Sequence, residues 1–117
     1  KIAVTMTSAG SRALFLSPTN ALHGDLGIVT EKDLVVMISK SGESDELMQL
    51  VPSIRNKQAK ILSIVNNGNS RVSRASDYSI TLPLKKELCP YDTVPTTSTM
   101  TQMLFGDALA IAMMMHK

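Results

Sequence analysis

Aromatic residues are scarce in this sequence, which has no tryptophan, two phenylalanines and two tyrosines among its 117 residues. Aromatic side chains provide the surfaces on which unpaired bases stack, and clustered basic side chains hold a phosphate backbone. The 12 basic and 10 acidic residues are interspersed and give a formal net charge of only +2. With neither aromatic platforms nor a basic stripe, the sequence disfavours a nucleic-acid partner.

Cysteine and long apolar runs are also lacking. Cys89 is the single cysteine, so no disulfide can form within the chain, which is typical of intracellular proteins. No apolar run approaches the roughly 20 residues that a membrane-spanning helix needs, and no secretion signal opens the chain. We therefore expect a cytoplasmic domain with no membrane partner.

The residues that are present suffice for one domain. About 44% of them are apolar, which is enough in a chain of this length to bury a core. No linker or repeat divides the sequence, so we expect a single domain over residues 1–117. The chain starts at Lys1 without an initiator methionine, and both ends fall within expected helices. We expect this domain to be incomplete at both ends.

The apolar pattern predicts alternating strands and helices. Strands are expected at 12–18, 33–39, 59–67 and 77–84. Helical segments are expected at 1–10, 19–29, 43–58, 67–76 and 99–117. The first could instead be a strand, the second starts at Thr19 or Asn20, and the third is bent or restarted at Pro52. The last is expected to be almost wholly buried, in the core or at a subunit interface. Near-continuous apolar strands joined by helices indicate an α/β fold, with an open, mostly parallel sheet and helices on both faces.

A serine-rich turn joins the expected strand 33–39 to the following helix. The sequence "ISKSGESDEL" places three serines around Gly42 at the carboxyl end of a strand, where open α/β sheets bind ligands. A helix start offers unpaired N–H groups to an anion, hydroxyls add donors that rotate, and glycine lets the backbone approach closely. The turn therefore suggests a neutral phosphate cradle. It has no "GK[ST]", so magnesium-dependent nucleotide chemistry is not indicated.

A simpler interpretation of this turn is helix capping. Ser41 or Ser44 could cap the helix, with Glu43 or Glu46 completing its first turn. One cap needs one hydroxyl, however, and three serines are present. The stretch "VPTTSTM" ahead of the last helix is a second hydroxyl-rich helix start, and capping alone is an equally good account of it.

Three side chains are candidates for proton transfer. Carboxylates and histidines suit this chemistry when they lie in a partly dry pocket. Glu46 lies in the first turn behind the serine-rich turn, where stabilising the helix dipole is the alternative. Glu87 lies on a long irregular connection, where it could simply be solvated, and the lone His23 in "LHGDLG" could be structural.

Taken together and in order, four stretches resemble one known family. The stretches "HGDLGIV", "ISKSGESDEL", "KKELCPYDTVPTTSTM" and "GDALAIAM" are similar to a sugar isomerase (SIS) domain along essentially the whole chain. The similarity is greatest to the arabinose-5-phosphate isomerases of lipopolysaccharide and capsule synthesis. The resemblance implies a three-layer fold of the flavodoxin or Rossmann kind.

The resemblance also implies roles for particular residues. Its phosphate loop corresponds to Ser39, Ser41, Gly42 and Ser44, with Lys40 contributing backbone. Family glutamates in the active site match Glu46 and Glu87, and the family histidine at His23 can take part in substrate or metal contact. The family stretch that faces the sugar matches Thr96, Thr97 and Ser98. No cofactor is implied.

The implied function is the interconversion of a ketose phosphate and an aldose phosphate through an enediol, most closely ribulose 5-phosphate and arabinose 5-phosphate. Such enzymes form homotetramers with sites between subunits. The family's "G-x-G-K-S" loop would precede Lys1, and its "S-H-P" histidine, often with CBS domains, would follow Lys117.

Two alternatives stay open. The first is a phosphosugar sensor, which needs the phosphate loop but no pair of proton-transfer groups, so that Glu46 and Glu87 together favour the enzyme. The second is a flavin or nucleotide binder of the flavodoxin kind. It would need aromatic side chains that this chain hardly has.

Overall fold

The computed structural model of the chain describes residues 1–83, 87, 91 and 95–116, so Cys89 lies outside the described residues. The chain forms two compact units. One consists of Leu16–Pro83, and the other combines Lys1–Phe15 with Leu84–Lys117. Each unit has its own packing, and the two are described separately.

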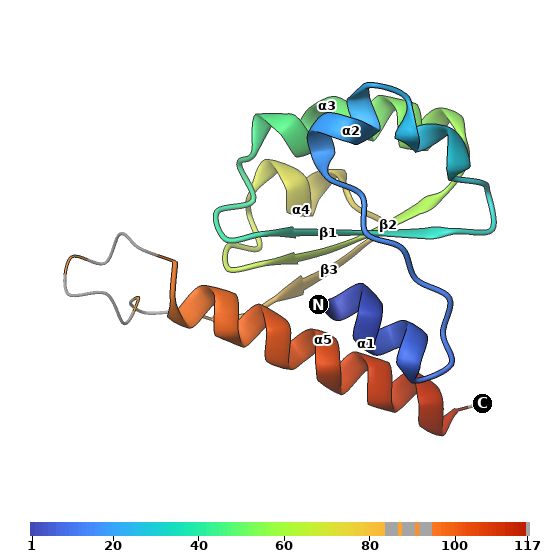
Figure 1. The fold of residues 1–117 in the computed structure, drawn as a ribbon. Coiled ribbons are helices and arrows are strands. Elements are labelled where there is room, and N and C mark those ends of the chain that lie inside the picture. Colours follow the sequence, from blue (N-terminus) through green and yellow to red (C-terminus); the bar gives the residue numbers. More distant parts are fainter. Residues whose placement is uncertain (84–86, 88–90, 92–94, 117) are drawn as a thin grey trace. The chain divides into compact units, whose positions relative to one another are not determined.

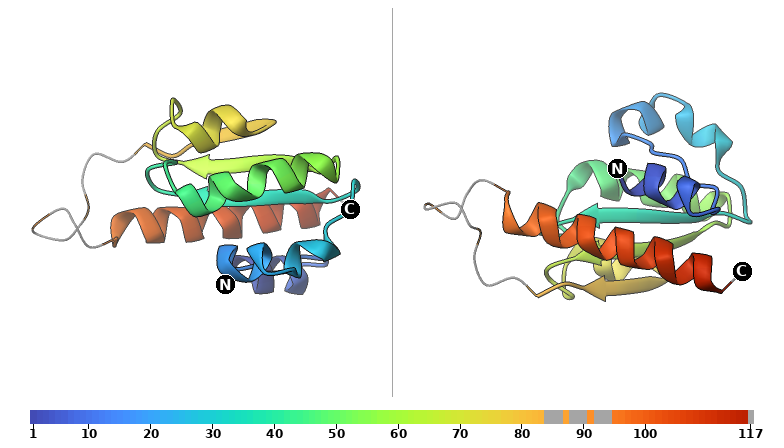
Figure 2. Two further views of the ribbon diagram at one scale, coloured as in Figure 1. Left: turned by 90° about the horizontal axis from the view of Figure 1, so that it is seen from above. Right: turned by 60° about the horizontal axis from the view of Figure 1, so that its bottom comes forward.

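The unit Leu16–Pro83 is built on a sheet of three parallel strands. These are β1 (Leu34–Ser39), β2 (Lys60–Val65) and β3 (Tyr78–Thr81), paired in the order β1-β2-β3 (Figures 1 and 2). Ser39 pairs with Val65, and Val65 pairs with Thr81, so the strands end level with one another. The last five residues of the central strand are buried. The predicted α/β fold with an open parallel sheet is confirmed.

Helical segments precede the first strand of this unit and connect its strands. They are α2 (Pro18–Leu22), the 3-10 helix η1 (Asp25–Ile28), α3 (Asp45–Asn56) and α4 (Arg71–Ala75). Helices α3 and α4 cross from one strand to the next, and both lie on the same face of the sheet (Figure 1). Their inward side chains, among them Ile54 and Val72, are fully buried with Ile61 of β2. Burial of these apolar side chains is the main stabilising contribution to the unit.

The predicted strand at 12–18 is wrong. Residues 11–17 form no regular structure, and the side chains of Leu14 and Phe15 are 70% and 65% exposed. Ser17 is the cap of α2, because its hydroxyl accepts the N–H of Asn20 at 3.2 Å, and Pro18 occupies the first helical position. Proline suits that position because its missing N–H would have no partner there. The "SP" pair therefore starts a helix, earlier than expected.

The predicted restart of the helix at Pro52 is also wrong. Helix α3 runs without interruption from Asp45 to Asn56, with Pro52 inside it. Proline removes one backbone hydrogen bond from a helix interior. Leu50 and Ile54 on either side of it are buried, and their packing outweighs that local loss.

The second unit contains α1 (Ile2–Ser8) and α5 (Thr97–Met115), which pack against each other. A Cβ atom added to Gly106 of α5 would lie 2.5 Å from Cγ1 of Ile2, so glycine permits this close approach. Lys1 Nζ lies 2.8 Å from a carboxylate oxygen of Asp107 across the same pair of helices. The predicted helix within residues 1–10 is therefore confirmed, and the strand alternative is wrong.

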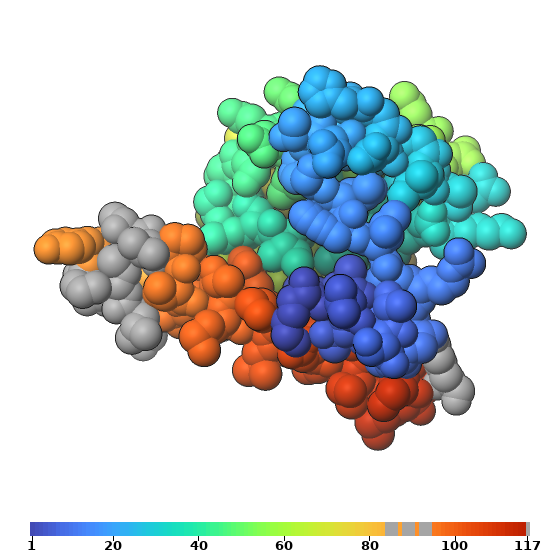
Figure 3. All heavy atoms as spheres, in the orientation of Figure 1, coloured from blue at the N-terminus to red at the C-terminus, as the bar shows by residue number. Residues whose placement is uncertain are grey.

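Most described residues of helix α5 are not buried within the chain, which disfavours the core alternative, while the predicted subunit interface stays a prediction. Among its described residues only Ser98, Gly106 and Ala110 are buried, while Leu104 is 71% and Met115 79% exposed. The red surface in Figure 3 includes its last turns. A helix of 19 residues is longer than the seven-residue α1 can cover. In the described part of the chain, no helix has the length and apolar character needed to cross a membrane.

Candidate functional site

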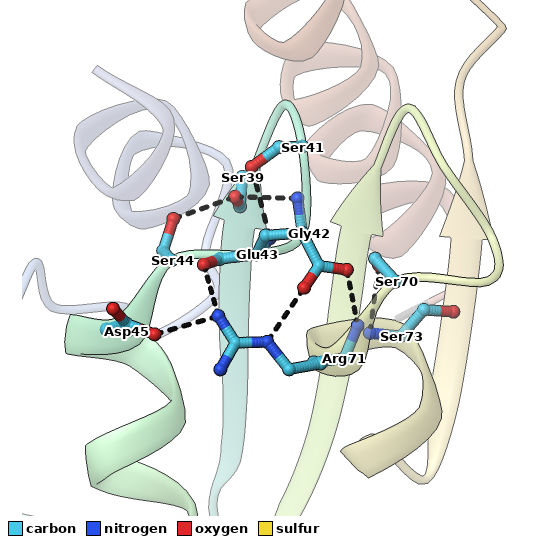
Figure 4. A network of polar contacts seen from close by, with 9 residues as sticks. All are labelled: Ser39, Ser41, Gly42, Glu43, Ser44, Asp45, Ser70, Arg71 and Ser73. Atoms are coloured by element: carbon cyan, nitrogen blue, oxygen red, sulfur yellow. Dashed lines mark hydrogen bonds and ion pairs between the residues drawn. The ribbon is translucent and has the colours of Figure 1, made fainter.

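The serine-rich turn lies between β1 and α3, at the edge of the sheet where the parallel strands end (Figure 4). Ser39 is the last residue of β1 and is buried. The carbonyl oxygen of Lys40 accepts the N–H of Asn66 at 3.0 Å, which ties the start of the turn to the end of β2. Polar groups thus gather at the edge that binds ligands in open parallel sheets.

The hydroxyls of this turn bond to one another and to the turn's own backbone. Ser39 Oγ accepts the N–H of Gly42 at 3.0 Å and lies 3.0 Å from Ser44 Oγ, and either hydroxyl of that pair can be the donor. Ser41 Oγ accepts the N–H of Glu43 at 3.1 Å. These contacts fold the turn into a compact loop, which we call the serine loop (residues 39–44).

Capping does not account for the hydroxyl of Ser44. Ser44 is the residue before the first turn of α3, but its side chain makes no capping hydrogen bond. In the same unit, Ser17 and Ser70 do cap their helices through their hydroxyls. The start of α3 therefore keeps backbone donors and the positive end of the helix dipole without a side-chain cap. An anion fits such a helix start.

Gly42 brings the serine loop against the start of α4. Its φ of 71° lies in the left-handed region, and an added Cβ would be 2.0 Å from Ser70 Oγ and 2.3 Å from Ser70 Cβ. The carbonyl oxygen of Gly42 accepts the N–H of Val72 at 2.9 Å. Both the backbone angle and the lack of space require glycine at this position.

Arg71, at the start of α4, makes four contacts with the loop region (Figure 4). Its backbone N–H and Nε donate to the Glu43 carboxylate at 3.0 and 2.7 Å. Its Nη2 donates to the Glu43 carbonyl oxygen at 2.6 Å and to Asp45 Oδ1 at 2.8 Å. The hydrogen bonds from Arg71 hold the pKa of Glu43 below its ordinary value of 4.5. The hydrogen bond that Arg71 donates to Asp45, followed in size by the one to Glu43, raises the pKa of Arg71.

Two predicted proton-transfer residues lie at the surface of this unit. Glu46 is exposed in the first turn of α3, directly after the serine loop. His23 is exposed and follows the last residue of α2. Their catalytic roles stay predictions. In the described part of the chain, no three His, Cys, Asp or Glu side chains gather as a metal site would require.

The other predicted carboxylate, Glu87, belongs to the second unit. One of its carboxylate oxygens accepts the N–H of Ser98 at 2.8 Å, and the other accepts the Ser98 hydroxyl at 2.7 Å. Glu87 and Ser98 are each only 2% exposed. Ser98 lies in the first turn of α5, so Glu87 is anchored at a helix start through charge-assisted hydrogen bonds.

The hydroxyl-rich start of α5 is used only partly for capping. Thr96 precedes the first turn and makes no side-chain capping bond, and Thr97 is half-buried. The Ser98 hydroxyl donates to Glu87. The predicted contact of all three residues with a sugar stays a prediction.

The sequence pattern grouped the serine loop correctly as one feature but did not reveal the role of Arg71. Glu43 was expected only to complete the first turn of α3, whereas its side chain binds the first residue of α4. The only local signal lies in "NSRVS", where Ser70 is a helix cap and an arginine follows it. That pattern predicts a helix start but not what the arginine binds.

Comparison with known proteins gave consistent results. The family model described as "SIS domain" matches residues 1–112. A protein of Escherichia coli O6:H1 strain CFT073 named arabinose 5-phosphate isomerase KpsF is 48% identical over 113 residues, which are 97% of this chain and 35% of that protein. A second Escherichia coli protein of that name is 45% identical over all 117 residues, or 37% of its own length.

A solved structure is also similar. It is that of an Escherichia coli CFT073 protein in complex with arabinose 5-phosphate, with a TM-score of 0.94 and 33% sequence identity. The match covers 97% of this chain and 60% of that one. The chain thus spans only about a third of the length of the curated relatives.

Proposed function

The chain belongs to the SIS domain family, and from this premise we propose that it forms the phosphosugar-binding core of an aldose–ketose isomerase. The proposed reaction interconverts ribulose 5-phosphate and arabinose 5-phosphate. The proposal of a phosphate site rests mainly on the hydroxyl of Ser44, which pairs with Ser39 beside a helix start that has no side-chain cap. The relatives named arabinose 5-phosphate isomerase support the choice of substrate.

In the proposed reaction the serine loop holds the phosphate through its hydroxyls and the backbone N–H groups that begin α3. A base removes a proton from the carbon next to the carbonyl and returns it to the neighbouring carbon. A second group moves a proton between the two oxygens. Glu87 is our candidate for the base, with Glu46 and His23 as candidates for the second group. The atoms balance without a cofactor.

The exposed apolar side chains of α5, among them Leu104 and Met115, support assembly into a homo-oligomer. We include a tetramer with shared sites in the proposal, together with a cytoplasmic location and a role in supplying lipopolysaccharide or capsule synthesis.

The decisive experiment uses the full-length protein in deuterated water. Ribulose 5-phosphate is added, and NMR follows the formation of aldose and the deuterium at its second carbon. Arabinose 5-phosphate that carries solvent deuterium there is expected, because the base exchanges the proton it has taken from carbon with the solvent before it returns one to the second carbon. Saturable binding without turnover would instead indicate a phosphosugar sensor, and absence of binding would refute both functions.

Replacing Ser44 by alanine is expected to weaken binding of the phosphosugar about tenfold or more and to change stability little. A hydrogen bond to a charged group contributes about 1.5–3 kcal/mol. In stability the Ser44 hydroxyl has no cap to lose, and Ser39 Oγ keeps the Gly42 N–H when its pairing with Ser44 is removed. Isothermal titration with arabinose 5-phosphate and thermal unfolding measure the two effects.

Ser17→Ala is the matched control, because that hydroxyl does cap its helix. It should lower the free energy of unfolding by about 1 kcal/mol and leave the affinity unchanged. If Ser44→Ala behaved like Ser17→Ala, the serine loop would be a capping structure only.

A further inference from the structure

Two helix starts lie beside the serine loop, and the loop occupies only one of them. At α4, the N–H of Arg71 donates to the Glu43 carboxylate, that of Val72 to the Gly42 carbonyl oxygen, and that of Ser73 to Ser70 Oγ. The first-turn donors of α4 are therefore used within the protein. At α3 no side chain caps the start, so a ligand's phosphate is directed to α3.

The Arg71 side chain links these two starts. It reaches Glu43 through Nε, and through Nη2 it reaches both the Glu43 carbonyl oxygen and the carboxylate of Asp45, the first residue of α3. A single exposed ion pair contributes little to stability. A planar guanidinium with three acceptors, however, fixes the direction of the backbone between them.

The positive charge of Arg71 also offsets the negative charges near the serine loop. Glu43 lies within the serine loop and Asp45 directly follows it, and both carry carboxylates that would repel a phosphate dianion. Arg71 lies 2.7 and 2.8 Å from these carboxylates, so its charge offsets theirs at short range. Because Nε and Nη2 are directed at Glu43 and Asp45, these donors act on the loop and on the start of α3.

We propose that Arg71 is a positioning residue of the phosphate site, which holds the serine loop in its binding conformation and offsets the charges of Glu43 and Asp45. This proposal rests on the proposed function of the loop as a phosphosugar site. Arg71 itself does not contact the phosphate. Its removal should therefore alter substrate affinity more than the rate of the chemical step.

The test compares Arg71→Met with Arg55→Met in the full-length protein. Arg55 is a close match, because it is 41% exposed against 42% for Arg71 and joins a carboxylate, that of Asp77, and a carbonyl oxygen, that of Ala75. Titration with inorganic phosphate and steady-state kinetics with ribulose 5-phosphate are the measurements. Arg71→Met should raise the Kd for phosphate and the KM about tenfold, with a much smaller change in kcat. Arg55→Met should leave all three values unchanged.

A double-mutant cycle with Glu43→Gln tests the mechanism. The two substitutions should be non-additive, with Arg71→Met costing less phosphate affinity once Glu43 is neutral.

If Arg71→Met is unstable, Arg71→Lys keeps the charge but not the planar guanidinium with its paired donors, and a several-fold rise in the Kd for phosphate is still expected. Wild-type affinity in every Arg71 variant that folds, or additivity in the cycle, would overturn the role of Arg71 while the wild-type protein still bound phosphate. A wild-type protein that binds neither phosphate nor ribulose 5-phosphate would overturn the proposed function itself.

Discussion

A Glu87→Gln variant is expected to lose about 100- to 10,000-fold in kcat, the range typical of removing a general acid or base. The amide of glutamine cannot accept the proton that a carboxylate takes from carbon. The Glu87 carboxylate is buried and accepts two hydrogen bonds from Ser98 at a helix start. Those two hydrogen bonds hold the carboxylate in a fixed orientation.

The fold should survive this substitution because glutamine has nearly the same shape as glutamate. Its oxygen can accept the Ser98 N–H, and its amide can donate to the Ser98 hydroxyl, which is free to rotate. The readouts are the rate of arabinose 5-phosphate formation, the incorporation of solvent deuterium and thermal unfolding. Loss of deuterium incorporation with the melting temperature retained is the expected pattern.

Asp107→Asn is the matched control in the same unit, since it also turns a carboxylate into an amide. Asp107 pairs with Lys1 and is partly exposed, so its substitution should leave kcat unchanged. A Glu87→Gln protein that still exchanged the proton at the wild-type rate would remove Glu87 from the proposed reaction.

A Gly42→Ala variant is expected to lose phosphate binding and to unfold more easily, by on the order of 2–5 kcal/mol. Its methyl group would lie 2.0 Å from Ser70 Oγ and 2.3 Å from Ser70 Cβ, at a φ of 71° that alanine rarely adopts. The loop must therefore move away from α4, which alters the positions of the hydroxyls that flank Gly42. Titration with inorganic phosphate and denaturant unfolding measure both effects.

Two further variants separate strain from steric overlap. Gly27→Ala is the control, because Gly27 has no atom within 4 Å of an added Cβ and no positive φ. It should bind phosphate normally. Adding Ser70→Gly to Gly42→Ala removes both overlapping atoms and should restore only part of the stability, since the unfavourable φ and the 3.3 Å approach to Val65 Cγ1 remain and the Ser70 cap of α4 is lost. Normal phosphate binding by Gly42→Ala alone would show that the loop geometry does not matter.

The parts of the fold that could be predicted depend on local pattern. The apolar runs at 33–39 and 59–67 became β1 and β2, because a short, nearly continuous apolar run bounded by turn residues favours a strand. The serine loop could be located for the same reason, since it follows directly after such a run. The run at 12–18 has a similar local pattern but forms no strand. There the "SP" pair begins a helix, which the alternation of apolar residues did not indicate.

The remaining features depend on contacts between distant residues. Arg71 meets Glu43 across 28 positions of sequence, over a complete strand and helix. Glu87 meets Ser98 across 11 positions, over a stretch of sequence with no apolar period to analyse. The core and interface alternatives for α5 could not be separated from the sequence, because composition shows how apolar a helix is but not how much of it the rest of the chain covers.

The different use of the two helix starts beside the serine loop has a consequence for substrate length. Since α4 is filled by the protein's own groups and α3 is left open, a phosphate has one anchoring point on the loop. With that end fixed, the number of carbons between phosphate and carbonyl determines where the reacting carbons lie. If the loop binds a phosphosugar as proposed, a sugar phosphate one carbon shorter or longer should bind through its phosphate but react poorly, because its carbonyl would be displaced by one carbon from the reacting position.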